Sequence, residues 1–313
     1  MRIAFFGLPL AAWLLHRDGH DLDPVVLSPL PAPGRRRVKR LLGDVVIDAL
    51  LTPRQTLGAR VEARLDGAEV LLSWFWTRRL PEGWLGRCPL GAYGVHPSLL
   101  PRHRGPDPFF WAIDAADART GVTLHHLAAD YDTGDIVWQE EFGGEELRTG
   151  SAWRLAKALD RPSLRLLRRA ARELSDGRAL PRTSQDEASA TWAPAPDGDL
   201  LKCPWSAGTA AVVRRVRALS PEPGVPLEIA GLRLDLLKAS SDERLPLALL
   251  PGEAQITSSA VRIRTGDGGV RVERVRLESG QEVDGTRLAE LVSARTQVID
   301  SRESLEGTNE RPR

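Results

Sequence analysis

A histidine and an aspartate stand in surroundings that suit general acid–base chemistry. His96 ends the apolar run AYGVH before the loop PSLLPRHRG, and Asp132 opens the turn DTGD. Acyl transfer to an amine needs a base for the amine proton, a donor for the oxyanion and a carboxylate that orients the base. His96 and Asp132 supply the base and the carboxylate if the turn folds over the strand end, and Gly134 lets the chain turn tightly there.

Taken singly, these residues have ordinary structural explanations. A lone histidine is most often a core or surface residue, and aspartate in a D-x-G sequence commonly forms a turn. A metal site is not predicted from the neighbouring residues. His125 and His126 are adjacent, so in a strand they point to opposite faces. The aspartates of the turn lack the spacing of a cation-binding loop: Asp130, Asp132 and Asp135.

Short apolar runs separated by helical segments or loops predict the scaffold for these residues. We expect strands at 2–7, 24–28, 45–51, 69–75, 92–96, 121–127 and 135–142. We expect helices at 9–18 and at 151–175, the second broken at Pro162. This alternation predicts an α/β fold with a parallel sheet, in which ligands bind at the carboxyl ends of the strands. The strand at 92–96 delivers His96 to that end.

The composition changes after residue 178. Residues 179–205 are rich in proline, serine, aspartate and glycine, which predicts a linker. An amphipathic helix at 207–219 and short alternating segments with glycine turns predict a small β-barrel domain. We therefore expect a catalytic domain at 1–178, a C-terminal domain at 206–295 and a flexible tail at 296–313.

Composition excludes several classes of protein. The 313 residues hold 43 Lys+Arg and 42 Asp+Glu, so a general nucleic-acid-binding coat is not implied, although a local basic patch is possible. Cys88 and Cys203 are too few for a disulfide framework or a cysteine-rich zinc site. The apolar N-terminus is interrupted by Gly7 and Pro9, and no run reaches the roughly 18 residues of a membrane span. We expect a cytoplasmic protein, monomeric and outside the membrane.

The stretch HPSLLPRHRGPDP and, later, GVTLHHLAADYDTGDIV contain the whole constellation around His96 and Asp132. Together they resemble the folate-dependent formyltransferase family, whose pattern has a histidine, an SLLP loop, an arginine–glycine pair, a GVT strand and a D-x-G-x-I turn. The resemblance covers nearly the whole chain and is closest to the branch that formylates methionyl-tRNA. It implies a Rossmann-like formyltransferase domain followed by a small OB-like β-barrel domain, with 10-formyltetrahydrofolate as the formyl donor.

The resemblance also assigns roles to individual residues. His96 and Asp132 are the implied catalytic pair. The implied donor-binding residues are Ser98, Leu99, Leu100, Pro101 and Gly134. The segment SWFW occupies the place of the loop that faces folate, and a flat pterin suits apolar walls. Its aromatic residues either form that wall or end a buried strand as core residues: Trp74, Phe75 and Trp76.

One position departs from the family pattern. The family has asparagine two residues before the histidine, to bind the formyl oxygen, and this chain has Gly94. Residues 94 and 96 of a strand share a face, so the missing side chain falls on the active face. Loss of one oxyanion donor typically costs about 10²–10³ in rate. Protonated His96 could take that role, another side chain could fill the space (Tyr93 points the other way), or the enzyme is weak or altered.

The sequence constrains the identity of the acceptor amine least. The run GRRRVKR carries five cations in seven residues, which would attract phosphates of a tRNA or of a nucleotide sugar, or would simply form a solvated helix start. The predicted acceptor-binding residues are Arg36, Arg37, Lys39, Arg40 and Arg104. The two-domain architecture favours initiator tRNA. Gly94 and the SWFW segment favour a small amine, such as an amino sugar nucleotide, or a non-catalytic binding protein.

Overall fold

The computed structural model describes residues 1–242 and 248–306, with side chains as far as residue 295. The chain forms two compact units. The N-terminal unit comprises residues 1–108, 118–144 and 156–195, and the C-terminal unit comprises 109–117, 145–155 and the chain from 196 onward. Among the described residues, no helix has the length and apolar character needed to cross a membrane.

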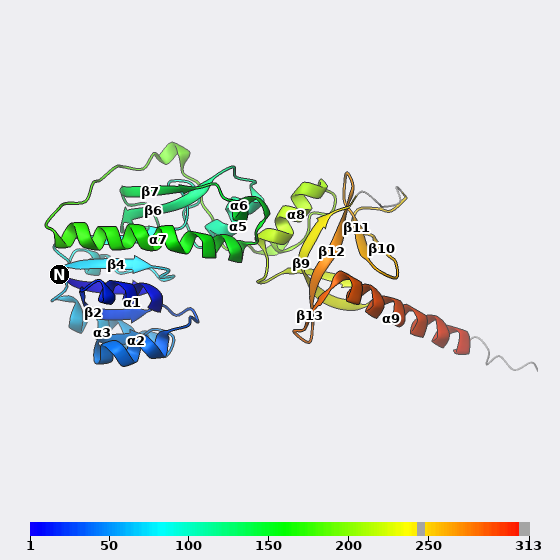
Figure 1. Cartoon of the computed structure of the whole chain (residues 1–313), viewed down its shortest axis with the longest axis horizontal. Coiled ribbons are helices and arrows are strands. Elements are labelled where there is room, and N and C mark those ends of the chain that lie inside the picture. Colours follow the sequence, from blue (N-terminus) through cyan, green and yellow to red (C-terminus); the bar gives the residue numbers. More distant parts are fainter. Residues whose placement is uncertain (243–247, 307–313) are drawn as a thin grey trace, which may run out of the picture. The chain divides into compact units, whose positions relative to one another are not determined.

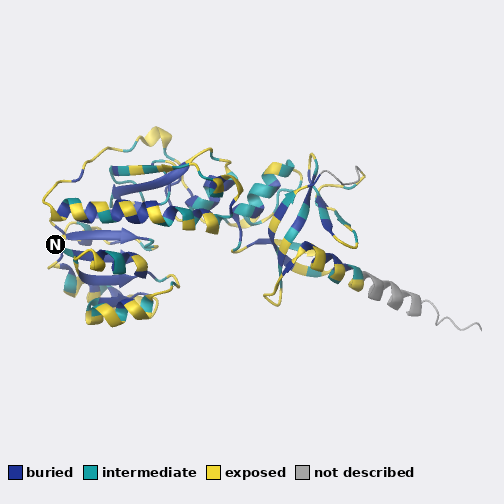
Figure 2. Ribbon diagram, in the orientation of Figure 1, coloured by how far each residue is buried: buried dark blue, intermediate teal, exposed yellow. Residues whose placement is uncertain are grey.

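The N-terminal unit is built on a seven-stranded sheet in the order β3-β2-β1-β4-β5-β6-β7 (Figure 1). Its strands are β1 (Arg2–Gly7), β2 (Asp21–Leu27), β3 (Val46–Asp48), β4 (Val70–Trp74), β5 (Ala92–His96), β6 (Thr120–His126) and β7 (Ile136–Phe142). Strands β1 to β5 pair in parallel, whereas β6 is antiparallel to β5 and to β7. The central strands are buried along almost their whole length, as their continuous apolar runs predicted (Figure 2).

Helices alternate with these strands along the chain. They are α1 (Pro9–Arg17), α2 (Arg35–Leu42), α3 (Arg54–Leu65), α4 (Glu82–Leu85), α5 (Pro108–Asp114), α6 (Glu145–Thr149) and α7 (Ala152–Ser175), of which α5 and α6 belong to the C-terminal unit. The break predicted at Pro162 is wrong, because α7 continues through it. Proline removes one helical hydrogen bond, but leucines on both sides of it, such as Leu159 and Leu167, are buried and hold the helix in place.

Part of the predicted linker is ordered along the N-terminal unit. Thr183 and Ile136 exchange backbone hydrogen bonds of 2.8 and 3.0 Å. Farther on, the Ala193 amide donates to the Arg104 carbonyl at 2.6 Å, and the Arg104 amide donates to the Thr191 carbonyl at 2.9 Å. Residues 181–193 therefore form a strap that reaches both β7 and the loop after β5. We call these residues the strap below.

The C-terminal unit is a curled antiparallel sheet in the order β10-β11-β12-β9-β8, with β13 paired to β12 (Figure 1). Its elements are α8 (Thr209–Ala218), β8 (Val225–Ile229), β9 (Leu232–Ser241), β10 (Ala254–Ile256), β11 (Val261–Arg264), β12 (Gly269–Leu277), β13 (Glu282–Asp284) and α9 (Gly285–Glu306). The predicted OB-like β domain is confirmed. Helix α9 enters the predicted tail 296–313, and residues 307–313 of that tail lie outside the described residues.

Arginines of α8 are structural in this unit. Arg215 forms a bidentate ion pair with Asp114, at 2.9 and 2.8 Å, and donates to the carbonyls of Leu200 and Lys202 at 3.1 Å. Arg217 donates to the Gly150 carbonyl at 2.8 Å. The side chains of Arg215 and Asp114 are 12% and 17% exposed, so the pair is largely removed from water. These cations hold backbone in place.

Replacing Arg215 with methionine is expected to lower the free energy of unfolding of the C-terminal unit by about 3 kcal/mol, because Asp114 is left without its partner. Arg274→Met is the matched control, since Arg274 is 53% exposed and lies 3.8 Å from Glu282. That control should change the free energy by less than about 0.5 kcal/mol. Denaturant unfolding measures both, and equal midpoints for the two variants would contradict the structural role of Arg215.

Candidate active site

Strand register gathers the site on one face of the sheet. On β5 and β6, His96 lies opposite Thr123, and Gly94 lies opposite His125. Residues directly opposite in an antiparallel pair project to the same side, as do residues two apart in one strand. Gly94, His96, Thr123 and His125 therefore share a face, at the carboxyl end of β5.

The turn after β6 brings Asp132 to this face. Asp132 has φ 58°, a left-handed conformation that aspartate tolerates better than most residues. A Cβ at Gly134 would lie 1.9 Å from the His126 carbonyl oxygen, so only glycine fits there. Gln185 of the strap donates hydrogen bonds to the carbonyls of Asp132 and Gly134, at 2.8 and 2.7 Å. The turn is thus fixed by Gln185 and by the close packing of Gly134 against the His126 carbonyl.

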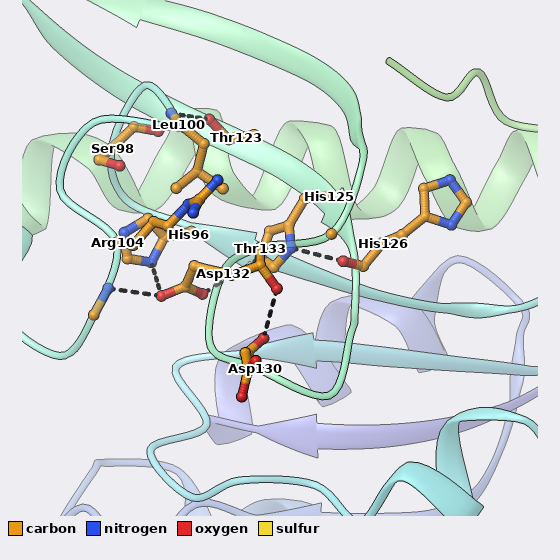
Figure 3. A network of polar contacts seen from close by, with 12 residues as sticks. His96, Ser98, Leu100, Arg104, Thr123, His125, His126, Asp130, Asp132 and Thr133 are labelled. Atoms are coloured by element: carbon orange, nitrogen blue, oxygen red, sulfur yellow. Dashed lines mark hydrogen bonds and ion pairs between the residues drawn. The ribbon is translucent and has the colours of Figure 1, made fainter. Parts of the chain in front are cut away.

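The Asp132 carboxylate lies between two imidazole rings (Figure 3). Its Oδ2 is 3.4 Å from Nδ1 of His96, and its Oδ1 is 3.6 Å from Nε2 of His125. The Gly105 amide donates to Oδ2 at 2.9 Å. The sequence predicted that Asp132 would lie beside His96, and the structure brings them together. His126 points away from this cluster in Figure 3.

The loop after β5 supports the cluster mainly through its backbone. The His103 carbonyl accepts from Nε2 of His96 at 2.7 Å, and Gly105 binds Asp132. Ser98, which is fully buried, donates to the Arg102 carbonyl at 2.6 Å. The Leu100 amide donates to the Thr123 hydroxyl at 3.1 Å. Ser98 and Leu100 thus shape the loop, whereas Leu99 and Pro101 are half-buried.

Hydrogen bonding and burial distinguish the two histidines. A carbonyl only accepts, so Nε2 of His96 carries a hydrogen, and its Nδ1 faces Asp132. In His125 the hydrogen is on Nδ1, which donates to the His126 carbonyl at 2.8 Å. Burial lowers the pKa of His125, and Asp132 opposes that shift. His125 is therefore held neutral, with the lone pair of Nε2 directed toward the cluster.

The aromatic segment after β4 lies next to β5. Ser73 and Trp74 pair with Gly94 and Val95, so Phe75 and Trp76 follow at the same sheet edge as His96. Trp74 is only 2% exposed and packs edge-on against Phe75, with ring centroids 5.0 Å apart, as a core residue would. Phe75 and Trp76 are half-buried. The rings of Phe75 and Trp76 are therefore partly exposed, unlike that of Trp74.

The predicted acceptor-binding residues divide into two groups. Arg36, Arg37 and Arg40 are exposed on α2, whereas Lys39 lies 3.5 Å from Asp48. Arg104 is 7% exposed, and its guanidinium is held by Gln185 and Glu187 of the strap, at 2.8 and 2.6 Å. The donors of Arg104 thus fix the strap to the loop after β5, and its predicted acceptor-binding role stays a prediction.

Comparisons with known proteins identify the family. The formyl transferase family model matches residues 39–147, and the model of the formyl transferase C-terminal domain matches residues 202–291. A methionyl-tRNA formyltransferase of Anaeromyxobacter dehalogenans (strain 2CP-C) is 33% identical over 295 residues, which are 89% of this chain and 93% of the relative. The chain belongs to the formyl transferase family. A methionyl-tRNA formyltransferase of Syntrophus aciditrophicus (strain SB) is 30% identical over 299 residues, 90% of this chain and 93% of the relative.

Solved structures share the fold of this formyltransferase. HypX from Aquifex aeolicus in complex with tetrahydrofolic acid superposes with a TM-score of 0.66 at 22% identity, over 92% of this chain and 46% of HypX. The N-formyltransferase from Helicobacter canadensis in complex with folinic acid and dTDP-3-aminofucose has a TM-score of 0.65 at 13% identity, over 87% of this chain and 98% of that one. Among the described residues, no group of three His, Cys, Asp or Glu side chains is placed to hold a metal ion.

The sequence alone did not predict several residues of this formyltransferase site. Gln185 lies in the segment predicted as a linker, and Thr123, which also accepts from Gln139 at 2.9 Å, lies in a strand predicted only as scaffold. His125 was considered solely as a metal ligand. The available signal was the alternation of β6, which puts Thr123 and His125 on the same face.

Asp132→Asn is expected to lower kcat of formyl transfer by about 10²–10⁴, because a neutral amide keeps the turn but removes the charge shared by both imidazoles. His96→Ala should lower kcat by a factor in the same range. Thr133→Ala, one residue along the turn, is the matched control and should stay within about threefold of wild type, since its hydroxyl donates to the Asp130 carbonyl at 3.2 Å, outside the cluster of imidazoles. Turnover of Asp132→Asn close to wild type would remove Asp132 from the mechanism.

Proposed function

We propose that this formyltransferase moves a formyl group from 10-formyltetrahydrofolate to a primary amine at the cluster of His96, Asp132 and His125. The observation that carries the proposal is the half-buried carboxylate between two imidazoles, 3.4 and 3.6 Å away. Such a cluster can hold a proton taken from an amine and present positive charge to a developing oxyanion. Its position at the carboxyl end of β5 is where sheets of this class bind ligands.

The segment after β4 fits a folate donor. Phe75 and Trp76 offer half-buried aromatic surface to a flat ring, and Nε1 of Trp76 and Nη1 of Arg78 are buried donors without a hydrogen-bond partner in the part of the chain that the structure describes. Buried donors normally have partners, so a ligand with acceptor atoms accounts for them. HypX and the Helicobacter canadensis enzyme, which share this fold, were solved with a tetrahydrofolate and with folinic acid.

The chain's own groups have separate roles in the transfer. The bound donor supplies the formyl carbon. The charged form of His96, with its ring fixed by the His103 carbonyl and Asp132, stabilises negative charge on the formyl oxygen. Asp132 holds the compensating negative charge, and the Gly105 amide fixes its orientation. The Asp132 side chain is 16% exposed and that of His96 7% exposed, so the cluster is largely shielded from water.

For the acceptor we propose the amino group of initiator methionyl-tRNA. Two findings support it: both family domains are present, and relatives named methionyl-tRNA formyltransferase are about as long as this chain. The exposed arginines of α2 supply cations that suit phosphates: Arg36, Arg37 and Arg40. Arg35, by contrast, is held by Asp48 and by the carbonyls of Ser28 and Leu30.

A small amine, such as an amino sugar nucleotide, is the second candidate. The observation in its favour is that most arginines of the C-terminal sheet have acidic partners there. Arg262 pairs with Asp242 at 2.9 Å, and Arg276 with Asp235 at 3.0 Å and with Glu222 at 2.5 Å. A sheet neutralised in this way offers few cations to a tRNA backbone.

The salt dependence of binding distinguishes these acceptors. A tRNA acceptor requires the affinity to fall linearly with salt on a double-logarithmic plot. Arg36→Ala with Arg40→Ala should lower the slope by about two, roughly one for each lost phosphate contact. Arg161→Ala, an exposed arginine of α7, is the control and should leave the slope unchanged. Formyl transfer is followed by folate release with charged initiator tRNA or with a panel of small amines.

The outcomes separate three possibilities. Salt-insensitive turnover of a small amine without transfer to tRNA would replace the acceptor and leave the formyl transfer chemistry intact. Tetrahydrofolate binding without turnover of any amine would instead indicate a non-catalytic binding protein. Steep salt dependence with transfer to tRNA supports the proposal.

A further inference from the structure

The space beside Gly94 is filled from the neighbouring strand. A Cβ at position 94 would meet Nε2 of His125 at 3.5 Å and the Leu127 side chain at 2.8 Å. His125 lies directly opposite Gly94 in the register of β5 and β6. The imidazole of His125 is therefore within contact distance of that Cβ, and it lies beside Asp132 (Figure 3). The side chain that a larger residue at position 94 would displace is Leu127.

The hydrogen bonds of the cluster leave one basic nitrogen available. Both ring nitrogens of His96 face partners, the His103 carbonyl and Asp132. In His125, Nδ1 donates to the His126 carbonyl, so Nε2 of the neutral ring holds a lone pair. The 3.6 Å between this nitrogen and Oδ1 of Asp132 is too long for a hydrogen bond. Two acceptors that face each other at this distance suit a proton donor, such as an amine, bound at both.

We propose that His125 is a catalytic residue of this chain: its Nε2, together with Oδ1 of Asp132, binds the attacking amine and accepts its proton. This inference rests on the proposed amine formylation. His96 and His125 then have different tasks, since His96 stabilises the oxyanion and His125 acts as the base. A base needs an available lone pair. The ring of His125 has one at Nε2, because burial lowers the pKa of His125 and keeps the ring neutral.

The proposed step balances. The amine nitrogen forms a bond to the formyl carbon with its lone pair and gives one proton to Nε2 of His125. The resulting imidazolium is paired with Asp132, which compensates the buried charge. The bond between the formyl carbon and the donor nitrogen then breaks with its electron pair on that nitrogen. This nitrogen takes up a proton, which His125 can return, so the protein ends in its initial protonation state.

The titratable and charged groups near His125 set its pH dependence. Asp132 from the turn after β6 and His96 from β5 lie on its face, and His126 follows it on β6 with its side chain on the opposite face. Asp132 raises the pKa of His125, whereas charge on His96 or His126 lowers it, and burial lowers it most. The neutral base therefore persists below the usual histidine range. We expect kcat/KM to fall on the acid side, as pH drops through this lowered pKa.

The central variant is His125→Gln, which keeps a polar side chain but cannot take up a proton. We expect kcat to fall by about 10²–10⁴ and the acid limb assigned to His125 to vanish from the pH profile. His126→Gln is the matched control, because it changes the adjacent histidine, which points away from Asp132, and should stay within about threefold. Thermal unfolding and tetrahydrofolate binding, expected unchanged, exclude misfolding as the cause.

A double variant separates a base from a hydrogen-bond donor or space-filler. Gly94→Asn alone should lower activity at least tenfold, because its Cβ would meet the Leu127 side chain at 2.8 Å and its amide would crowd the His125 ring, 3.5 Å from that Cβ. Gly94→Asn combined with His125→Ala restores an amide donor but no base. We expect this double variant to remain at least about 100-fold below wild type. Activity within tenfold of wild type would overturn the proposal.

A measurement independent of turnover completes the test. Imidazole ¹⁵N shifts should show the His125 proton on Nδ1 and titration below the ordinary histidine range. Asp132→Asn should lower the pKa of His125 further, because Asp132 raises it. A proton on Nε2 in the neutral ring would refute the base role even in an active enzyme. Absence of formyl transfer by the wild type, with the expected shifts intact, would instead refute the proposed function.

Discussion

The placement of one carboxylate organises this site. Asp132 is flanked by two imidazoles and receives the Gly105 amide, so a shift of the turn would disturb all of these contacts at once. The backbone of the turn lies in a conformation that is costly for residues with side chains, and such conformations persist only where the surroundings determine them. Here two features fix the conformation of the turn. Gln185 of the strap donates to its carbonyls, and Gly134 lies close to the His126 carbonyl.

Much of the N-terminal fold follows from local patterns in the sequence. Buried parallel strands give continuous apolar runs, and these runs predicted nearly all the strands and the position of His96 at the end of β5. The nearness of His96 and Asp132 was also predictable, because a strand end and a tight turn can meet at one sheet edge. The error at Pro162 shows the limit of such rules: burial of a long amphipathic helix outweighs one lost hydrogen bond.

Roles that depend on partners distant in sequence were not predictable in the same way. Arg104 belongs to a basic loop in the sequence, but its partners come from the strap, which composition alone describes as a linker. Trp74 is similar, because only the packing shows that it is buried while Phe75 and Trp76 keep surface. A cation or an aromatic residue in a sequence has several possible partners, and tertiary contacts decide among them.

The relation between Gly94 and His125 has the same origin. A long connection separates β5 from β6, so their register, and thus the pairing of these residues, does not follow from spacing. A Cβ at position 94 would meet the Leu127 side chain at 2.8 Å and the His125 ring at 3.5 Å. With glycine at 94, this face carries the titratable ring of His125 but no amide from residue 94. A second imidazole on one carboxylate makes the charge of the cluster depend on pH, since a proton on either ring disfavours a proton on the other. Under the proposed role of His125, this chain lacks an amide at position 94 and uses a second imidazole to take up the amine proton.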